Sequence, residues 1–212
     1  MNNYITVKGY GKAEHVEKKS RFIGQVFPVK TEEEVRKILE ETKKSFWDAS
    51  HNVYAYRLRS GEARFSDDGE PSGTAGKPTL DVILGADARD VLVIVTRYFG
   101  GTLLGTGGLV RAYSKGARIA LEAGELVSME PFFRCQVVMD YTYLSKVEYL
   151  IREAGFPSEG AEYGEKVTLR FFVPKDQLEA FQKKITEISD GKLVMESSKA
   201  PNFLPIPIKN SY

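Results

Sequence analysis

Five glycines lie within the nine residues from Gly100 to Gly108, inside the segment Arg97–Arg111, which reads RYFGGTLLGTGGLVR. Glycine adopts backbone conformations, and permits close approaches, that a Cβ would block. We expect the end of this segment to open a helix, and the free amides of a helix N-terminus favour a negative charge. The chemistry that the pattern supports is therefore binding of phosphate or another anion.

Basic side chains follow the glycines at helical spacing. Arg111, Lys115 and Arg118 stand at i, i+4 and i+7, so on a helix they share one face. The predicted contacts to an anion, to RNA or to a partner are Arg57, Lys77, Arg97, Gly100, Gly101, Thr106, Gly107, Gly108, Arg111, Lys115 and Arg118. The alternative is that the glycines only fold a tight connection and the basic face is only solvated.

The glycine spacing matches neither of the two familiar nucleotide motifs. No Lys-Ser/Thr pair follows the glycines, as a P-loop requires, and no acidic residue stands at the distance that a dinucleotide site needs. We therefore expect no cofactor.

The segment Ser66–Pro78, SDDGEPSGTAGKP, has the composition of a loop. Its acidic residues Asp67, Asp68 and Glu70 could bind a hard cation or a partner, although their spacing does not fit a calcium loop. The acids could also belong to a plain loop, and no metal site is predicted. If Asp67–Lys77 faces the glycine segment across a cleft, the protein could instead bind a small ligand or act as a hydrolase-type enzyme.

The remaining reactive residues are few. The chain has two histidines, His15 and His51, which excludes a His-rich metal centre. His51 stands beside an expected strand, where a histidine is either a structural residue or, with a nucleophile nearby, a base. Cys135 is the single cysteine, so no intrachain disulfide forms, and its apolar strand predicts a buried, inert thiol.

Composition predicts a soluble, cytoplasmic protein. The net charge is +1, from 30 basic and 29 acidic residues, so any nucleic-acid site must be a local patch. No apolar run approaches the roughly 20 residues of a membrane helix. The N-terminus, MNNYITVKGYGK, lacks the apolar core of a signal peptide.

Periodicity predicts an α+β class with two domains. In residues 1–130 we expect strands at 21–29, 52–59 and 91–95, the last one buried on both faces. Three helices are expected in the same residues. A capping box of Thr31 and Glu34 begins the first, and Pro78 begins the second, which carries Leu80, Ile83 and Leu84. The third runs over 106–123, with Val110 among its inward residues.

Residues 131–199 show the order βαββαβ of a ferredoxin-like domain. The expected strands are 133–141, 158–163, 166–173 and 193–198, with helices at 145–154 and 175–189. The domain boundary is placed near Pro131. The Pro-rich tail 200–212 is expected to be extended or disordered, because its prolines cannot continue a sheet.

Three motifs resemble the IMPACT family, in the family's order: HNVYAYR from His51, DDGEPSGTAGKP from Asp67, and RYFGGTLLGTGGLVRAY from Arg97. The resemblance covers roughly residues 1–125 and implies a mixed α/β sandwich like a domain of a small-subunit ribosomal protein and of elongation factor G. The remainder is similar to the C-terminal domain of bacterial members, which resembles a ferredoxin-like domain of elongation factor G. No catalytic residues are implied.

Eukaryotic relatives of that family regulate translation in amino-acid starvation, by competing for a kinase's ribosome-associated co-activator. This chain lacks their N-terminal interaction domain, so the resemblance does not carry the kinase role. The leading hypothesis is a non-enzymatic regulator of translation or stress response that binds RNA, the ribosome or a translation factor. A pure protein-interaction module is a further alternative.

Overall fold

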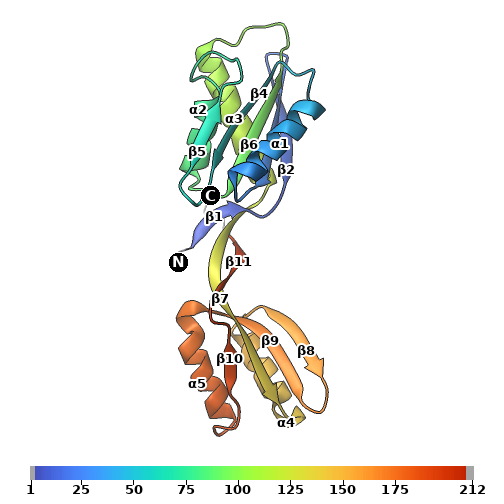
Figure 1. Ribbon diagram of the computed structural model, residues 1–212, viewed down its shortest axis with the longest axis vertical. Coiled ribbons are helices and arrows are strands. Elements are labelled where there is room, and N and C mark those ends of the chain that lie inside the picture. The colour runs from blue at the N-terminus through green and yellow to red at the C-terminus, as the bar shows by residue number, and fades with distance from the viewer. Residues whose placement is uncertain (1–2, 209–212) are drawn as a thin grey trace. The chain divides into compact units, whose positions relative to one another are not determined.

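The computed structural model describes residues 3–208. The chain divides into two compact units. Of the described residues, the N-terminal unit holds 4–128 and 205–208, and the C-terminal unit holds 3 and 129–204. Both units combine sheet with helices, so the α+β class is confirmed (Figure 1).

A five-stranded antiparallel sheet is the centre of the N-terminal unit. Its strands, in spatial order, are β2 (Gly11–Glu17), β3 (Ser20–Pro28), β6 (Val91–Tyr98), β4 (His51–Arg57) and β5 (Ala63–Ser66). A short strand, β1 (Tyr4–Val7), precedes them. Strands β1, β2 and β5 were not predicted, because they are short or rich in charged and exposed residues.

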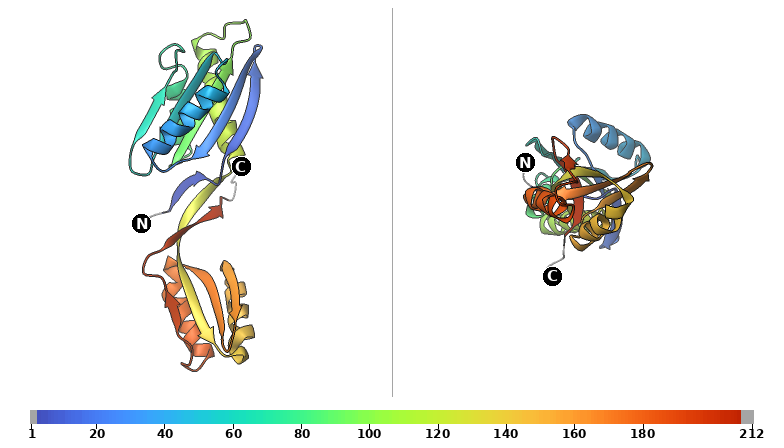
Figure 2. Two further views of the ribbon diagram at one scale, coloured as in Figure 1. Left: turned by 45° about the vertical axis from the view of Figure 1, so that its right-hand side comes forward. Right: turned by 90° about the horizontal axis from the view of Figure 1, so that it is seen from below.

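Helices cover both faces of this sheet. Helix α1 (Glu32–Ser45) lies on one face, and α2 (Gly76–Gly85) and α3 (Thr106–Ala123) lie on the other (Figure 2). Along β6, Val93 and Val95 belong to the core under α2 and α3, whereas Leu92 and Ile94 belong to the core under α1. The prediction that this strand is buried on both faces is confirmed.

The predicted helix signals are present. The Glu34 amide donates to Thr31 Oγ1 at 3.2 Å, as in a capping box. The return bond is displaced by one residue, since the Glu34 carboxylate accepts from the amide of Lys30, at 2.6 Å, and not from that of Thr31. Helix α3 spans the predicted residues and Gly124 is its C-cap. One inward assignment was wrong, because Val110 is 38% exposed.

The C-terminal unit has the ferredoxin-like element order. Its elements are β7 (Leu126–Met139), α4 (Tyr141–Glu153), β8 (Ser158–Tyr163), β9 (Val167–Pro174), a 3-10 turn η1 (Lys175–Gln177), α5 (Leu178–Ile188) and β10 (Met195–Ser197). The strands pair antiparallel in the order β10-β7-β9-β8, which places the first and last strands of the motif side by side. A separate apolar core underlies this sheet, with Val137, Phe171 and Ile185 fully buried.

The two units divide between Ser128 and Met129, inside β7, which begins at Leu126. One expectation about this region needs correction. The tail continues a sheet, since β11 (Asn202–Pro207) pairs with β7. Proline is tolerated there because β11 has a neighbour on one side only. Residues 209–212 of the predicted tail lie outside the described part. No helix within residues 3–208 is long and apolar enough to cross a membrane.

Candidate functional site

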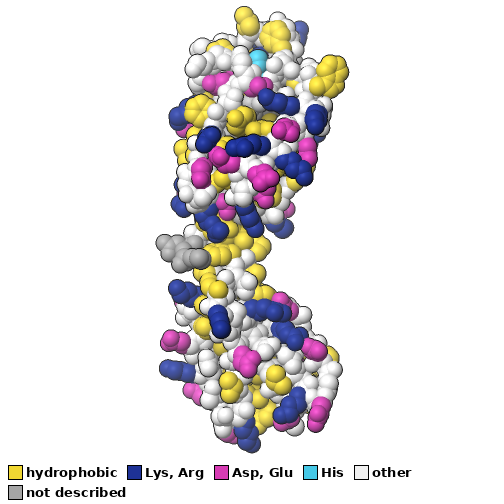
Figure 3. Space-filling view, viewed as in Figure 1, with side chains coloured by type: hydrophobic (Ala, Val, Ile, Leu, Met, Phe, Trp, Pro, Cys, Tyr) yellow, Lys and Arg dark blue, Asp and Glu magenta, His cyan; other side chains and the backbone are white. Residues whose placement is uncertain are grey.

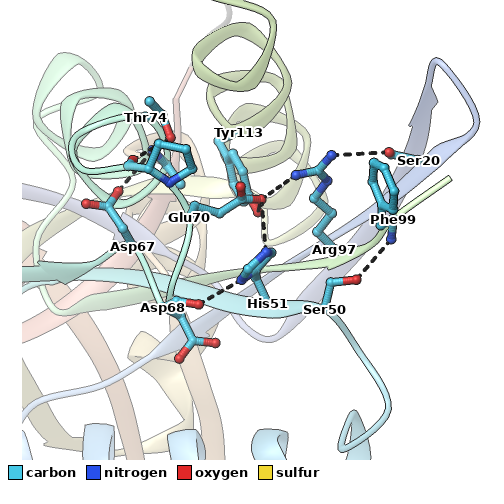
Figure 4. Close-up of polar contacts among 12 residues, drawn as sticks. Ser20, Ser50, His51, Asp67, Asp68, Glu70, Thr74, Arg97, Phe99 and Tyr113 are labelled. Atoms are coloured by element: carbon cyan, nitrogen blue, oxygen red, sulfur yellow. Dashed lines mark hydrogen bonds and ion pairs between the residues drawn. The ribbon is translucent and has the colours of Figure 1, made fainter. Parts of the chain in front are cut away.

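The two loop segments singled out from the sequence meet at Glu70 (Figure 4). Glu70 Oε1 accepts from Arg97 Nη1 at 2.6 Å and from the Tyr113 hydroxyl at 2.7 Å. The acceptor belongs to the β5–α2 loop, and the donors belong to β6 and α3. Glu70, Arg97 and Tyr113 are 8%, 5% and 0% exposed, so this is a buried charge pair with a phenol bound to it.

Burial governs the ionisation of the phenol in this cluster. Loss of hydration raises the pKa of Tyr113, and the hydrogen bond to the Glu70 carboxylate raises that pKa further. Tyr113 therefore stays a neutral donor to Glu70 throughout the physiological pH range.

His51, the first residue of β4, lies against the same carboxylate. Its Nδ1 is 2.8 Å from the Asp68 carbonyl oxygen, and its Nε2 is 3.8 Å from Glu70 Oε1. A carbonyl can only accept, so the proton of the neutral ring stays on Nδ1 and Nε2 keeps its lone pair. One ring nitrogen of His51 is thus held by the backbone, and the other faces the buried carboxylate.

The acids of the β5–α2 loop are occupied by the protein itself. Asp67 accepts from the amides of Gly73, Ala75 and Gly76 at 2.7–3.0 Å, which holds the start of α2. Asp68 accepts from the Asn52 amide at 2.7 Å. Glu70 is neutralised by Arg97, so the three acids do not converge as a cation site. Within residues 3–208, no group of three or more His, Cys, Asp or Glu residues is placed to hold a metal ion.

Different local constraints explain why glycine occupies different positions of the 97–111 segment. A Cβ at Gly100 would lie 2.1 Å from the backbone of Lys19, so the two loops can touch only through glycine. Gly101 and Gly105 have φ of 82° and 72°, in the left-handed region. Gly105 is the N-cap of α3 and supplies no side-chain hydrogen bond. The first-turn amides of Thr106, Gly107 and Gly108 therefore remain open to a ligand.

The predicted basic face is exposed on α3. Arg111, Lys115 and Arg118 have no ion-pair partner in the part of the chain that the structure describes. A Cβ at Gly107 would lie 3.6 Å from Arg111 Nη1, so the guanidinium lies over the first turn of the helix. The structure thus places one exposed cation beside the first turn of α3.

Three other predicted cations are placed differently. Arg97 is buried and its charge is neutralised by Glu70, so it does not face solvent as expected. Arg57 Nη1 donates to Asp87 Oδ1 at 2.8 Å, and Lys77 pairs with Asp81 on the same helix. Sequence reasoning also missed Ser20, whose Oγ accepts from the Gly100 amide at 3.1 Å. Nothing in the local pattern around Ser20 indicates that contact.

Comparison with known proteins bears on both units. A family model described as the Impact N-terminal domain matches residues 18–121, and one described as a domain of unknown function (DUF1949) matches residues 137–192. A solved structure titled "Crystal structure of an hypothetical protein" superimposes with a TM-score of 0.59 at 30% identity, over 94% of this chain and 98% of that one.

Curated relatives match at similar length. "IMPACT family member YvyE" of Bacillus subtilis is 39% identical over 91% of this chain and 89% of its own, and "IMPACT family member YigZ" of Escherichia coli is 34% identical over 83% and 88%. "Protein IMPACT" of Xenopus laevis is 38% identical over 42% of this chain, which spans 30% of that longer protein. The sequence identity, its extent across both units and the matching domain order together place this chain in the IMPACT family.

Proposed function

We propose that the protein is a non-enzymatic regulator of translation that binds RNA through the start of α3. The observation that carries the proposal is the combination of open amides at Thr106–Gly108 with the guanidinium of Arg111 beside the first turn of the same helix. Backbone amides and a planar guanidinium are groups that commonly hold phosphate. Lys115 and Arg118 extend the same exposed face along the helix.

Membership of the IMPACT family is consistent with a regulatory role. Association with the ribosome or with a translation factor, a part in the stress response and a cytoplasmic location belong to this proposal. The near-zero net charge fits it as well, since RNA would be bound by a local patch and not by the field of the whole molecule.

Ribosome co-sedimentation and RNA gel shift at low salt test the proposal. Wild-type protein should bind, and Arg111→Ala should bind more weakly and flatten the slope of log affinity against log salt by about one unit, because one phosphate contact is lost. Arg152→Ala is the matched control, since Arg152 is an exposed arginine on α4 without an ion-pair partner in the described chain. Absence of binding by wild-type protein would refute the proposal.

A second candidate is a small-ligand-binding or hydrolase-type protein, and the placement of His51 beside Glu70 favours it. In that case the Asp67–Lys77 loop and the glycine segment form the two sides of the site. A thermal-shift screen with nucleotides, metal ions and ester substrates separates the two proposals. Stabilisation that Asp68→Ala abolishes would support the second candidate, because the Asp68 carboxylate holds the amide of Asn52, the residue next to His51.

A further inference from the structure

Three large apolar side chains are exposed at one end of the N-terminal unit. Trp47 and Leu103 are each 82% exposed, and Phe99 is 49% exposed. Trp47 belongs to the α1–β4 connection, and the other two belong to the β6–α3 loop. Hydrophobic side chains are visible at this end in Figure 3, over these connections. Exposed aromatic rings of this size indicate a binding surface more often than isolated small apolar residues do.

Hydrogen bonds hold the two connections together. The Phe99 amide donates to Ser50 Oγ at 3.1 Å, and the Tyr98 hydroxyl donates to Asp48 Oδ1 at 2.9 Å. The β2–β3 turn joins them through the close approach of Gly100 to Lys19. We call the three segments 17–20, 46–50 and 98–105 the tip. Its loops are anchored to one another, so the aromatic rings are carried on a braced surface.

Three exposed lysines lie in or next to the segments of the tip. Lys18 and Lys19 in the β2–β3 turn, and Lys44 at the end of α1, are exposed and have no ion-pair partner within residues 3–208. Two acids lie in the same segments, Glu17 and Asp48, and Asp48 is bound by the Tyr98 hydroxyl. The tip therefore offers unpaired positive charge beside exposed aromatic rings, which suits a polyanion that also has flat apolar faces.

We propose that the tip is a stacking platform for single-stranded RNA, with bases on Trp47 and Phe99 and phosphates on the lysines. Aromatic side chains interleaved with basic ones are the usual means of holding unpaired nucleotides. A duplex keeps its bases stacked inside and presents no face to these rings. This inference rests on the proposed function, which sets RNA as the ligand, and it adds that the RNA is unpaired where it meets the tip.

The tip segment 98–105 leads directly into the start of α3. Leu103 is three residues before Thr106, whose amide is the first of the open amides on α3. A strand that stacks on Trp47 and Phe99 would thus leave its next phosphates beside the Arg111 guanidinium.

The chain provides its own reporter, because Trp47 is its single tryptophan. Titration with a single-stranded oligouridine should quench the fluorescence of Trp47 saturably, since a base stacked on the indole ring quenches its excited state. A duplex RNA of the same length should leave the fluorescence nearly unchanged. Strong quenching by the duplex, or none by the single strand, would overturn the proposal.

Variants then separate stacking from charge. With a fluorescein-labelled oligouridine and anisotropy as readout, Trp47→Leu and Phe99→Leu should each weaken binding about tenfold, the order expected for the loss of one stacked base. Leucine keeps an apolar side chain and removes only the aromatic face. Tyr149→Leu is the control, because Tyr149 is 53% exposed on α4 of the other unit.

The outcomes distinguish this inference from the function on which it rests. If the aromatic variants bind as tightly as wild type while Arg111→Ala is impaired, the platform is wrong and RNA binding through α3 stands. If wild-type protein binds no RNA of either form, both proposals fail. Binding of a protein at the tip that Trp47→Leu abolishes, without any RNA binding, would replace RNA by a protein partner.

Discussion

The Glu70 carboxylate is held by a guanidinium and a phenol that come from different elements. A buried carboxylate and a buried guanidinium each lose their hydration, and their mutual attraction must offset that loss. Such a pair adds little net stability when compared with apolar residues of the same size. Removal of one partner is costly, however, because the other charge stays buried without compensation. The role that we assign to Glu70 and Arg97 is therefore to join the β5–α2 loop to β6.

A double-mutant cycle tests this role. Arg97→Met should lower the free energy of unfolding by about 3–5 kcal/mol, because it leaves Glu70 buried and unpaired. The double variant Glu70→Leu/Arg97→Met should lose less than the sum of the two single variants, since it removes both charges together. Urea denaturation measures all four proteins. Strictly additive losses would show that the pair is not coupled.

Among the elements, α3 and β3 approach each other more closely than side chains permit. A Cβ at Gly24 on β3 would lie 2.2 Å from the carbonyl oxygen of Gly116 on α3, and a Cβ at Gly116 would lie 2.9 Å from Val95 Cγ1. This contact sets how deep α3 lies on the sheet. It therefore also sets where the start of α3, with its open amides, stands relative to the β6 end of the sheet.

Gly24→Ala should consequently destabilise the N-terminal unit by at least about 1–3 kcal/mol, the usual cost of overpacking, because a backbone carbonyl and not a flexible side chain must move. Gly9→Ala is the matched control, since a Cβ at Gly9 would meet nothing within 4 Å. Thermal unfolding followed by circular dichroism compares them. A Gly24→Ala protein as stable as the control would mean that α3 can shift outward freely.

At the scale of the whole molecule, each unit has its own buried core, and the single cysteine belongs to the core of the C-terminal unit. Cys135 is 1% exposed, and burial raises the pKa of its thiol from an ordinary value of 9.0 to about 11. The expectation of a buried thiol is confirmed. Its ionisation is thereby tied to the unfolding of that unit.

The pH dependence follows from this shift. Between pH 9 and about 11 the unfolded chain loses the thiol proton, whereas the folded chain retains it. The free energy of unfolding therefore falls as the pH rises through this range, and the full contribution of the buried thiol is present only below pH 9. Wild-type protein should therefore lose more stability between pH 8 and about 10.5 than Cys135→Val, which carries no thiol. Urea denaturation at both pH values measures the difference. Equal losses in the two proteins would show that the thiol ionises as readily when folded.

The sequence by itself determined the features that depend on near neighbours. The apolar run Val91–Val95 specified a strand buried on both faces, and Thr31 and Glu34 marked the start of α1. The helical spacing of apolar residues over 106–123 specified α3. The βαββαβ order of the second unit was likewise readable, because periodicity and turn residues act within a few positions. The three family motifs could also be recognised from the sequence, because each is a continuous stretch of residues.

Only the tertiary structure decided which charges face water. Arg97 and Glu70 are 27 residues apart, and Tyr113 and Glu70 are 43 apart, so no local pattern indicates that they meet. The same holds for the pairing of β11 with β7 and for the convergence of Trp47, Phe99 and Lys19 at the tip. Burial and long-range pairing are set by the packing of whole elements. Consequently Arg97 is buried and does not belong to the predicted binding face, whereas Arg111, Lys115 and Arg118 are exposed on it.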